Sequence, residues 1–167
     1  MAIHSIEEGL ALYGLGLLRG EEIPDLALLF LAAGSNVLEM AALAGSLAID
    51  HPADRRADLE RAVRLAGRAF PDRVEAALTL RRTYAQRGAS GELSPREAAR
   101  LIIDVFQVVE GQLPNSSRFA GESFGIAKLM GLYYSYDDVP FGDTGSVREI
   151  DHDLTQELDR LATEASP

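Results

Sequence analysis

The sequence predicts an all-α fold in which residues 1–167 form a single helical domain, a compact bundle of seven to eight helices. Two observations carry this prediction. Apolar residues recur with the i, i+3, i+4 spacing of one helix face through most of the chain. No segment keeps the alternation of apolar and polar residues that is typical of a strand. The length of 167 residues, with 47% hydrophobic and 25% charged residues, also fits one ordinary globular domain.

The helix boundaries are predicted from caps, prolines and glycines. Ser5 and Glu8 form a capping box at the start of the first helix, and Pro24 suits the first turn of the second, where a missing N–H costs nothing. In order, the expected helices cover residues 6–18, 24–33, 36–48, 52–70, 71–88, 95–110, 123–134 and 147–165. The second helix is apolar on every side, so we expect it and the third at the centre of the bundle. The similar residues 20–24 and 91–95 each precede an apolar helix, which leaves open that the bundle consists of two related hairpin halves.

The composition excludes several kinds of chemistry. The chain has no cysteine, which removes disulfides, thiolate nucleophiles and thiolate metal sites. The most apolar stretch, residues 23–49, is interrupted by charges and a glycine turn, so it falls short of the ~20 residues that cross a bilayer. The first residues lack the basic start and apolar run of a signal peptide. We therefore expect a cytoplasmic protein with no membrane partner.

The charged residues are sorted along the chain. Residues 1–50 carry a net charge of −6, residues 51–100 carry +4 and residues 101–167 carry −8, which together give −10. A basic segment between two acidic ones predicts one of two arrangements. Either the segments neutralise each other within the fold, or different faces of the molecule recruit different partners.

The residues Gly121-Glu122-Ser123-Phe124-Gly125 match the G-x-S-x-G pattern of a nucleophile elbow, and His152 follows later in the chain. A small hydrolase that uses Ser123, or a metal bound by carboxylates, is therefore one alternative function. The elbow requires a buried strand before the serine and a parallel sheet, and the sequence predicts neither. We expect a protein that is not an enzyme and that needs no cofactor.

Two further patterns contain residue types that bind metals. Glu149 and His152 have the Glu-x-x-His spacing of di-iron helical bundles, but neither of the other two histidines has a glutamate three residues before it. Asp137, Asp138 and Asp143 cluster in a loop, yet the positions of the intervening residues do not fit an EF-hand. We expect no metal site at either place.

The Arg-rich helices of residues 55–87 favour a second alternative, a nucleic-acid-associated regulator. Arg61, Arg64 and Arg68 share one face of the predicted fourth helix and form its basic face. Nucleic-acid binding needs a concentrated basic surface, whereas this chain is acidic overall and carries glutamates and aspartates beside its arginines. We expect a solvated or internally paired face and no nucleic-acid partner.

The segment of residues 119–141 holds six of the eleven aromatic residues, interleaved with glycines and carboxylates. Tyrosine, glycine and aspartate on a loop over a rigid frame suit the recognition of a partner, in particular a cationic one. The alternative is that these aromatics close the end of the bundle as core. The candidate binding residues are Tyr133, Tyr134, Tyr136, Asp137, Asp138, Phe141 and Asp143.

The sequence therefore favours a non-enzymatic protein-interaction module. It would bind another protein through an acidic, aromatic C-terminal surface, and an immunity- or antidote-like role would be a special case. The identity of the partner is not predicted, and association between copies of the chain stays open.

Overall fold

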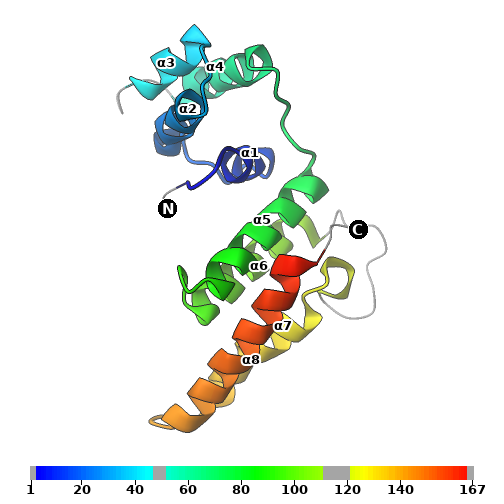
Figure 1. The fold of residues 1–167 in the computed structure, drawn as a ribbon. Coiled ribbons are helices and arrows are strands. Elements are labelled where there is room, and N and C mark those ends of the chain that lie inside the picture. Colours follow the sequence, from blue (N-terminus) through cyan, green and yellow to red (C-terminus); the bar gives the residue numbers. More distant parts are fainter. Residues whose placement is uncertain (1–2, 47–51, 111–120, 165–167) are drawn as a thin grey trace. The chain divides into compact units, whose positions relative to one another are not determined.

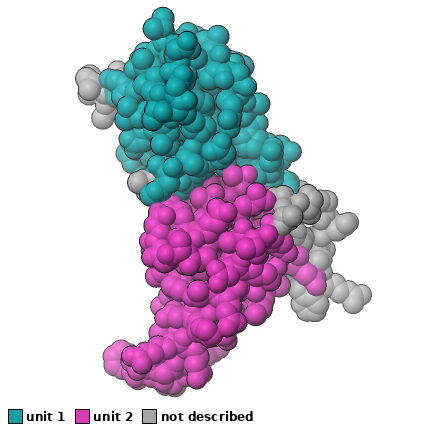
Figure 2. All heavy atoms as spheres, viewed as in Figure 1, with its two compact units in different colours: residues 1–76 teal, residues 77–167 magenta. Residues whose placement is uncertain are grey.

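The computed structural model describes residues 3–46, 52–110 and 121–164. These residues form eight α-helices and three short 3-10 helices, and none of them lies in a strand. The predicted all-α fold and its number of helices are confirmed. The chain divides into two compact units, residues 1–76 and residues 77–167 (Figure 2). That the two units form a single domain, and that they are related halves, both stay predictions.

The first unit contains α1 (Ile6–Gly14), η1 (Gly20–Glu22), α2 (Ile23–Ala32), α3 (Leu38–Ala44) and α4 (Pro52–Leu65), as Figure 1 shows. The serine cap predicted at its start is present, because the Ser5 hydroxyl accepts a hydrogen bond from the Glu8 N–H at 3.1 Å. The Glu8 carboxylate accepts from the N–H of His4 at 2.8 Å, one residue before the N-cap that a capping box would use. α1 is shorter than predicted and is followed by Gly16, which has a left-handed φ of +73°.

The prediction that α2 is buried on every side is wrong, although α2 contacts α1, η1, α3 and α4 of the first unit. α2 packs against α3 and buries Ile23, Leu26 and Phe30. Elsewhere on these helices the side chains of Leu28 and Leu38 are 52% and 82% exposed. An apolar helix is buried on every side only where enough other elements pack around it. The elements that contact α2 leave part of its apolar surface exposed.

Tyr13 joins three parts of the first unit. Its ring lies against Phe70 with 4.4 Å between the ring centroids, and its hydroxyl donates to a carboxylate oxygen of Glu60 on α4 at 2.5 Å. Burial and this hydrogen bond raise the pKa of Tyr13 to about 12, because both disfavour the phenolate.

Tyr13 should therefore titrate late in the folded protein. Its raised pKa stabilises the fold at neutral pH, and this contribution is lost as the pH rises from about 10 to about 12. We expect Tyr13→Phe to remove one late step from the near-ultraviolet titration of tyrosinate, and to lower the free energy of unfolding by about 1 kcal/mol. Loss of a step near pH 10, the ordinary pKa of a tyrosine, instead of a late step would contradict the Tyr13–Glu60 hydrogen bond.

The second unit contains most of α5 (Arg73–Ala89), together with α6 (Pro95–Val109), η3 (Glu122–Phe124), α7 (Ala127–Tyr134), η4 (Ser135–Asp138) and α8 (Thr144–Thr163). α6 begins at its predicted cap, since the Ser94 hydroxyl accepts from the Glu97 N–H at 3.3 Å. α6, α7 and α8 pack against one another. The core of this second unit contains Leu80, Tyr84, Ile102, Phe106, Phe124, Leu129, Leu154, Leu158 and Leu161.

Two boundaries in the second unit differ from prediction. The helix expected over residues 123–134 is divided into η3 and α7, because Gly125 between them has a left-handed φ of +72°. α8 begins at Thr144, before the predicted residue 147, because Asp143 caps it. Both differences lie beside the candidate binding residues.

Candidate functional site

The structure sorts the aromatic residues of the predicted binding segment into core and surface. Phe124 is buried beside Phe106, with 5.9 Å between ring centroids, and Tyr133 and Tyr136 are half-buried. Tyr134 is 46% exposed, and Phe141 is fully exposed. The core role is therefore confirmed for Phe124, while the recognition role stays a prediction for the aromatics that lie on the surface.

Tyr136 is held in place by contacts at its hydroxyl group and on the face of its ring. Its hydroxyl donates to a carboxylate oxygen of Asp151 on α8, and the guanidinium of Arg96 on α6 lies 4.6 Å from the centroid of its ring. Burial, followed by the hydrogen bond to Asp151, raises the pKa of Tyr136. Tyr136 therefore fixes η4 to α6 and α8. The cation that lies on its ring is Arg96 of the same chain.

Asp143 has a structural role as the N-cap of α8. Its carboxylate accepts from the N–H groups of Gly145 and Ser146 at 3.1 and 3.2 Å, and from the Ser146 hydroxyl at 2.7 Å. These hydrogen bonds, led by that of the Ser146 hydroxyl, lower the pKa of Asp143. The charge of Asp143 is thus kept in place at the start of a long helix, where the helix dipole favours it.

We call the exposed side chains at the end of α7 and in the segment before α8 the acidic tip. It consists of Tyr134, Asp137, Asp138, Pro140, Phe141 and Asp143. Residues 133–143 contain three aspartates and no basic residue, and the described residues offer no ion-pair partner to Asp137 or Asp138. A fully exposed phenylalanine thus lies in an ordered turn among unpaired carboxylates.

Of the predicted candidates, Tyr134, Asp137, Asp138 and Phe141 are exposed in the acidic tip, while Tyr136 and Asp143 hold its shape. Tyr133 lies edge-on to Tyr134, with 5.4 Å between ring centroids, and also lines a cavity beside α6. Arg96 and Asp151 are not among the predicted residues, since nothing in the local sequence of either pairs it with Tyr136.

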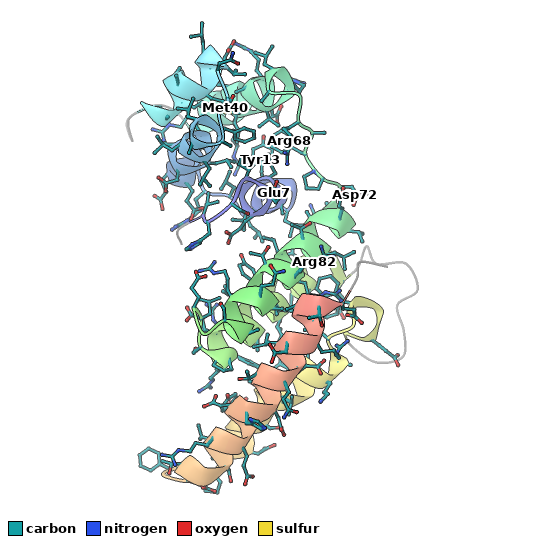
Figure 3. All side chains as sticks on the ribbon, viewed as in Figure 1. Glu7, Tyr13, Met40, Arg68, Asp72 and Arg82 are labelled. Atoms are coloured by element: carbon teal, nitrogen blue, oxygen red, sulfur yellow. The ribbon has the colours of Figure 1, made fainter. Side chains whose placement is uncertain are left out.

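The predicted basic face is divided by the end of α4. The helix stops at Leu65, and Arg68 follows Gly67, which has a left-handed φ of +70°. Arg68 then donates to Glu7 of α1 at 2.9 Å (Figure 3), so it does not continue the face of Arg61 and Arg64.

Arg61 lies 3.8 Å from Asp58, and Arg64 has no ion pair among the described residues. Arg55 and Arg56 donate to the carbonyls of Gly20 and Leu18 at 3.1 and 3.3 Å. Much of the positive charge of α4 is therefore directed at groups within the first unit.

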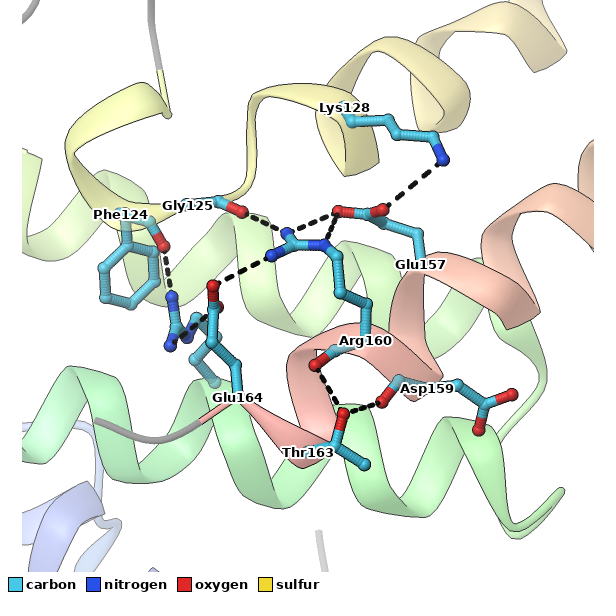
Figure 4. A network of polar contacts seen from close by, with 9 residues as sticks. Phe124, Gly125, Lys128, Glu157, Asp159, Arg160, Thr163 and Glu164 are labelled. Atoms are coloured by element: carbon cyan, nitrogen blue, oxygen red, sulfur yellow. Dashed lines mark hydrogen bonds and ion pairs between the residues drawn. The ribbon is translucent and has the colours of Figure 1, made fainter. Parts of the chain in front are cut away.

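In the second unit, one arginine of the basic segment pairs with a carboxylate at the end of α8, and ion pairs of Arg160 on α8 extend this network (Figure 4). Arg81 of α5 is 5% exposed. It donates to the carbonyl of Phe124 at 2.6 Å and lies 3.5 Å from a carboxylate oxygen of Glu164. Desolvation lowers the pKa of Arg81, and the Glu164 charge partly compensates.

Arg160 completes this network on α8. It binds Glu157 at 2.6 Å and Glu164 at 3.0 Å, and it donates to the carbonyl of Gly125 at 2.8 Å. Lys128 of α7 lies 3.5 Å from the other Glu157 oxygen. The two arginines thus bind the backbone of the turn that contains the G-x-S-x-G pattern.

That pattern has a structural explanation in this fold. Gly121 and Gly125 both have left-handed φ values, +79° and +72°, and a Cβ atom on Gly125 would lie 3.0 Å from a guanidinium nitrogen of Arg81. The side chain of Ser123 lies outside the described part of the structure. His152 is exposed on α8, with 2.8 Å between its Nε2 atom and the Nε2 atom of Gln156.

The described residues contain no group of three or more His, Asp and Glu side chains arranged to hold a metal ion. Glu149 and His152 are both exposed on α8.

None of the helices that the structure describes combines the length and the apolar character needed to cross a bilayer. Comparisons with protein families, curated proteins and solved structures find no match to the chain.

Proposed function

We propose that the protein binds another protein through the acidic tip, and that the partner contributes a basic segment with apolar side chains. The observation that carries the proposal is the full exposure of Phe141 among Asp137, Asp138 and Asp143. A large apolar side chain that stays in water forgoes the free energy that its burial would release, and aromatic residues, phenylalanine among them, are enriched in the cores of protein interfaces. A partner that covers Phe141 would recover this free energy.

Charge determines the kind of partner. Asp137 and Asp138 have no ion pair among the described residues, so an approaching acidic segment would be repelled and a basic one attracted. Beyond the cap of α8 the charges of Arg148 and Glu149 offset each other. Over residues 133–149 the net negative charge therefore equals that of the three aspartates of the turn.

Rigidity supports the same proposal. The hydrogen bond from Tyr136 to Asp151 and the three hydrogen bonds to Asp143 hold the turn on both sides of Phe141. A surface that is already ordered pays less conformational entropy when a partner binds. An antidote or immunity role, in which the acidic tip covers a basic effector, is a special case of this proposal.

Capture from an extract of the native host tests the proposal with three forms of the full chain. We expect a basic protein to bind the wild type, to bind Phe141→Ser about tenfold more weakly or worse, and to be released as salt rises. Leu28→Ser is the matched control, because it also replaces an exposed apolar residue but lies in the first unit.

A protein that Phe141→Ser captures as well as the wild type does would not be the proposed partner. If every captured protein behaves in this way, or if Leu28→Ser abolishes capture while Phe141→Ser does not, the proposed function is wrong.

A further inference from the structure

A cavity of about 420 Å³ opens beside the first turns of α6. Its lining residues are Ser94, Arg96, Glu97, Arg100 and Tyr133. Two arginines and one glutamate give this lining a net positive charge in a chain whose net charge is −10. The sign of the lining is thus opposite to that of the whole chain.

Arg96 is the most informative residue of the cavity. Its guanidinium is held over the ring of Tyr136 at 4.6 Å, and that ring is in turn fixed by Asp151. The described residues provide no hydrogen-bond acceptor or carboxylate for Arg96. A stacked arginine is therefore already oriented, while its N–H donors remain free to bind a ligand.

Arg100 and Tyr133 extend this donor set. One terminal nitrogen of Arg100 donates to Asp104 at 2.9 Å, and its remaining N–H groups have no acceptor among the described residues. The Tyr133 hydroxyl likewise has no hydrogen-bond partner in the described part of the chain. Glu97 is the one acidic residue of the lining, and its negative charge would repel a bound anion.

We propose that this cavity binds the phosphate group of a small phosphomonoester. Guanidinium groups bind phosphate oxygens through paired, charge-assisted hydrogen bonds, and a dianion suits two arginines better than a carboxylate does. The cavity is larger than one phosphate requires, since small-ligand sites begin at roughly 300 Å³. The remaining space beside Tyr133 would hold the organic part of the ligand. This site needs no partner protein, so its test does not depend on the function proposed for the acidic tip, although both regions share the contact of Arg96 with Tyr136.

Titration of the full chain with phenyl phosphate, followed by NMR signals of Arg96 and Tyr133, tests the site. We expect saturable binding that is about tenfold weaker in Arg96→Gln and stronger in Glu97→Gln, which removes the opposing carboxylate. Arg148→Gln is the matched control, because Arg148 is exposed on α8, is not part of the cavity lining and should leave binding unchanged.

Benzoate and inorganic phosphate serve as comparison ligands. Tighter binding of phenyl phosphate than of either one supports the assignment of both the phosphate and the organic group. Binding of benzoate that equals that of phenyl phosphate would overturn the phosphate assignment. Absence of saturation, or an equal loss in Arg96→Gln and Arg148→Gln, would overturn the site itself.

Discussion

Replacement of Arg81 by methionine is expected to lower the free energy of unfolding of the second unit by about 2–4 kcal/mol. Arg81 is 5% exposed and donates to the carbonyl of Phe124, a residue that is itself buried. Without the guanidinium, that carbonyl loses its charged donor, and Glu164 loses one of its two cations. Because Glu164 is itself partly exposed, water can replace part of that loss, which limits the effect.

Urea unfolding followed by circular dichroism measures this change. Arg148→Met is the matched control, since Arg148 is exposed on α8 and has no ion pair among the described residues. We expect the control to change the free energy of unfolding by less than about 0.5 kcal/mol. Equal effects of the two substitutions would show that Arg81 does not support the turn at Phe124.

Two glycine-to-alanine substitutions are expected to change stability in opposite directions. A Cβ atom on Gly88 of α5 would lie 2.7 Å from the Cβ atom of Ala98 and 2.7 Å from a methyl group of Leu158. Gly88→Ala should therefore destabilise the second unit by about 1–3 kcal/mol through overpacking. Gly131 of α7 has no neighbouring atom within 4 Å of the same position, so Gly131→Ala should gain about 0.5–1 kcal/mol from helix propensity.

A double substitution isolates the contact at Gly88. If the close approach to Ala98 causes the loss, Gly88→Ala combined with Ala98→Gly should destabilise by less than the sum of the two single substitutions. Additive effects would contradict this explanation. The same urea measurement serves all four variants.

Local signals in the sequence predicted local structure well. Ser5 and Ser94 cap the helices that they were expected to cap, because an N-cap depends on residues within one turn. The left-handed glycines at positions 16 and 67 explain two helix ends that the apolar spacing placed too late. Spacing alone identifies a face and does not determine where the backbone leaves the helix.

Tertiary neighbours could not be predicted in the same way. The position of α2 depends on how many helices surround it, and its apolar sequence is compatible with a central or a peripheral place. The partners of Tyr136 come from α6 and α8, so no local pattern contains them. For the same reason, the sequence identified the acidic tip as a region but did not separate the residues that hold it from those that it exposes.

The G-x-S-x-G pattern shows how one short motif serves different structures. In a nucleophile elbow its glycines permit a sharp turn after a strand. Here Gly121 and Gly125 permit a turn between helices, and the carbonyls at Phe124 and Gly125 accept from Arg81 and Arg160. The backbone requirement is shared by both structures, and only the surroundings distinguish them.

Photo-cross-linking at position 141 tests the central claim most directly. A photoreactive phenylalanine analogue replaces Phe141 in one form of the full chain and Leu28 in a second form, and both are irradiated in extract of the native host. We predict adducts at position 141 with a basic, apolar segment of one protein, and their loss when Asp137 and Asp138 are replaced by asparagine. Adducts that form mainly at position 28, or adducts at position 141 that are unaffected by loss of the aspartates, would contradict the proposal that the acidic tip binds a basic partner.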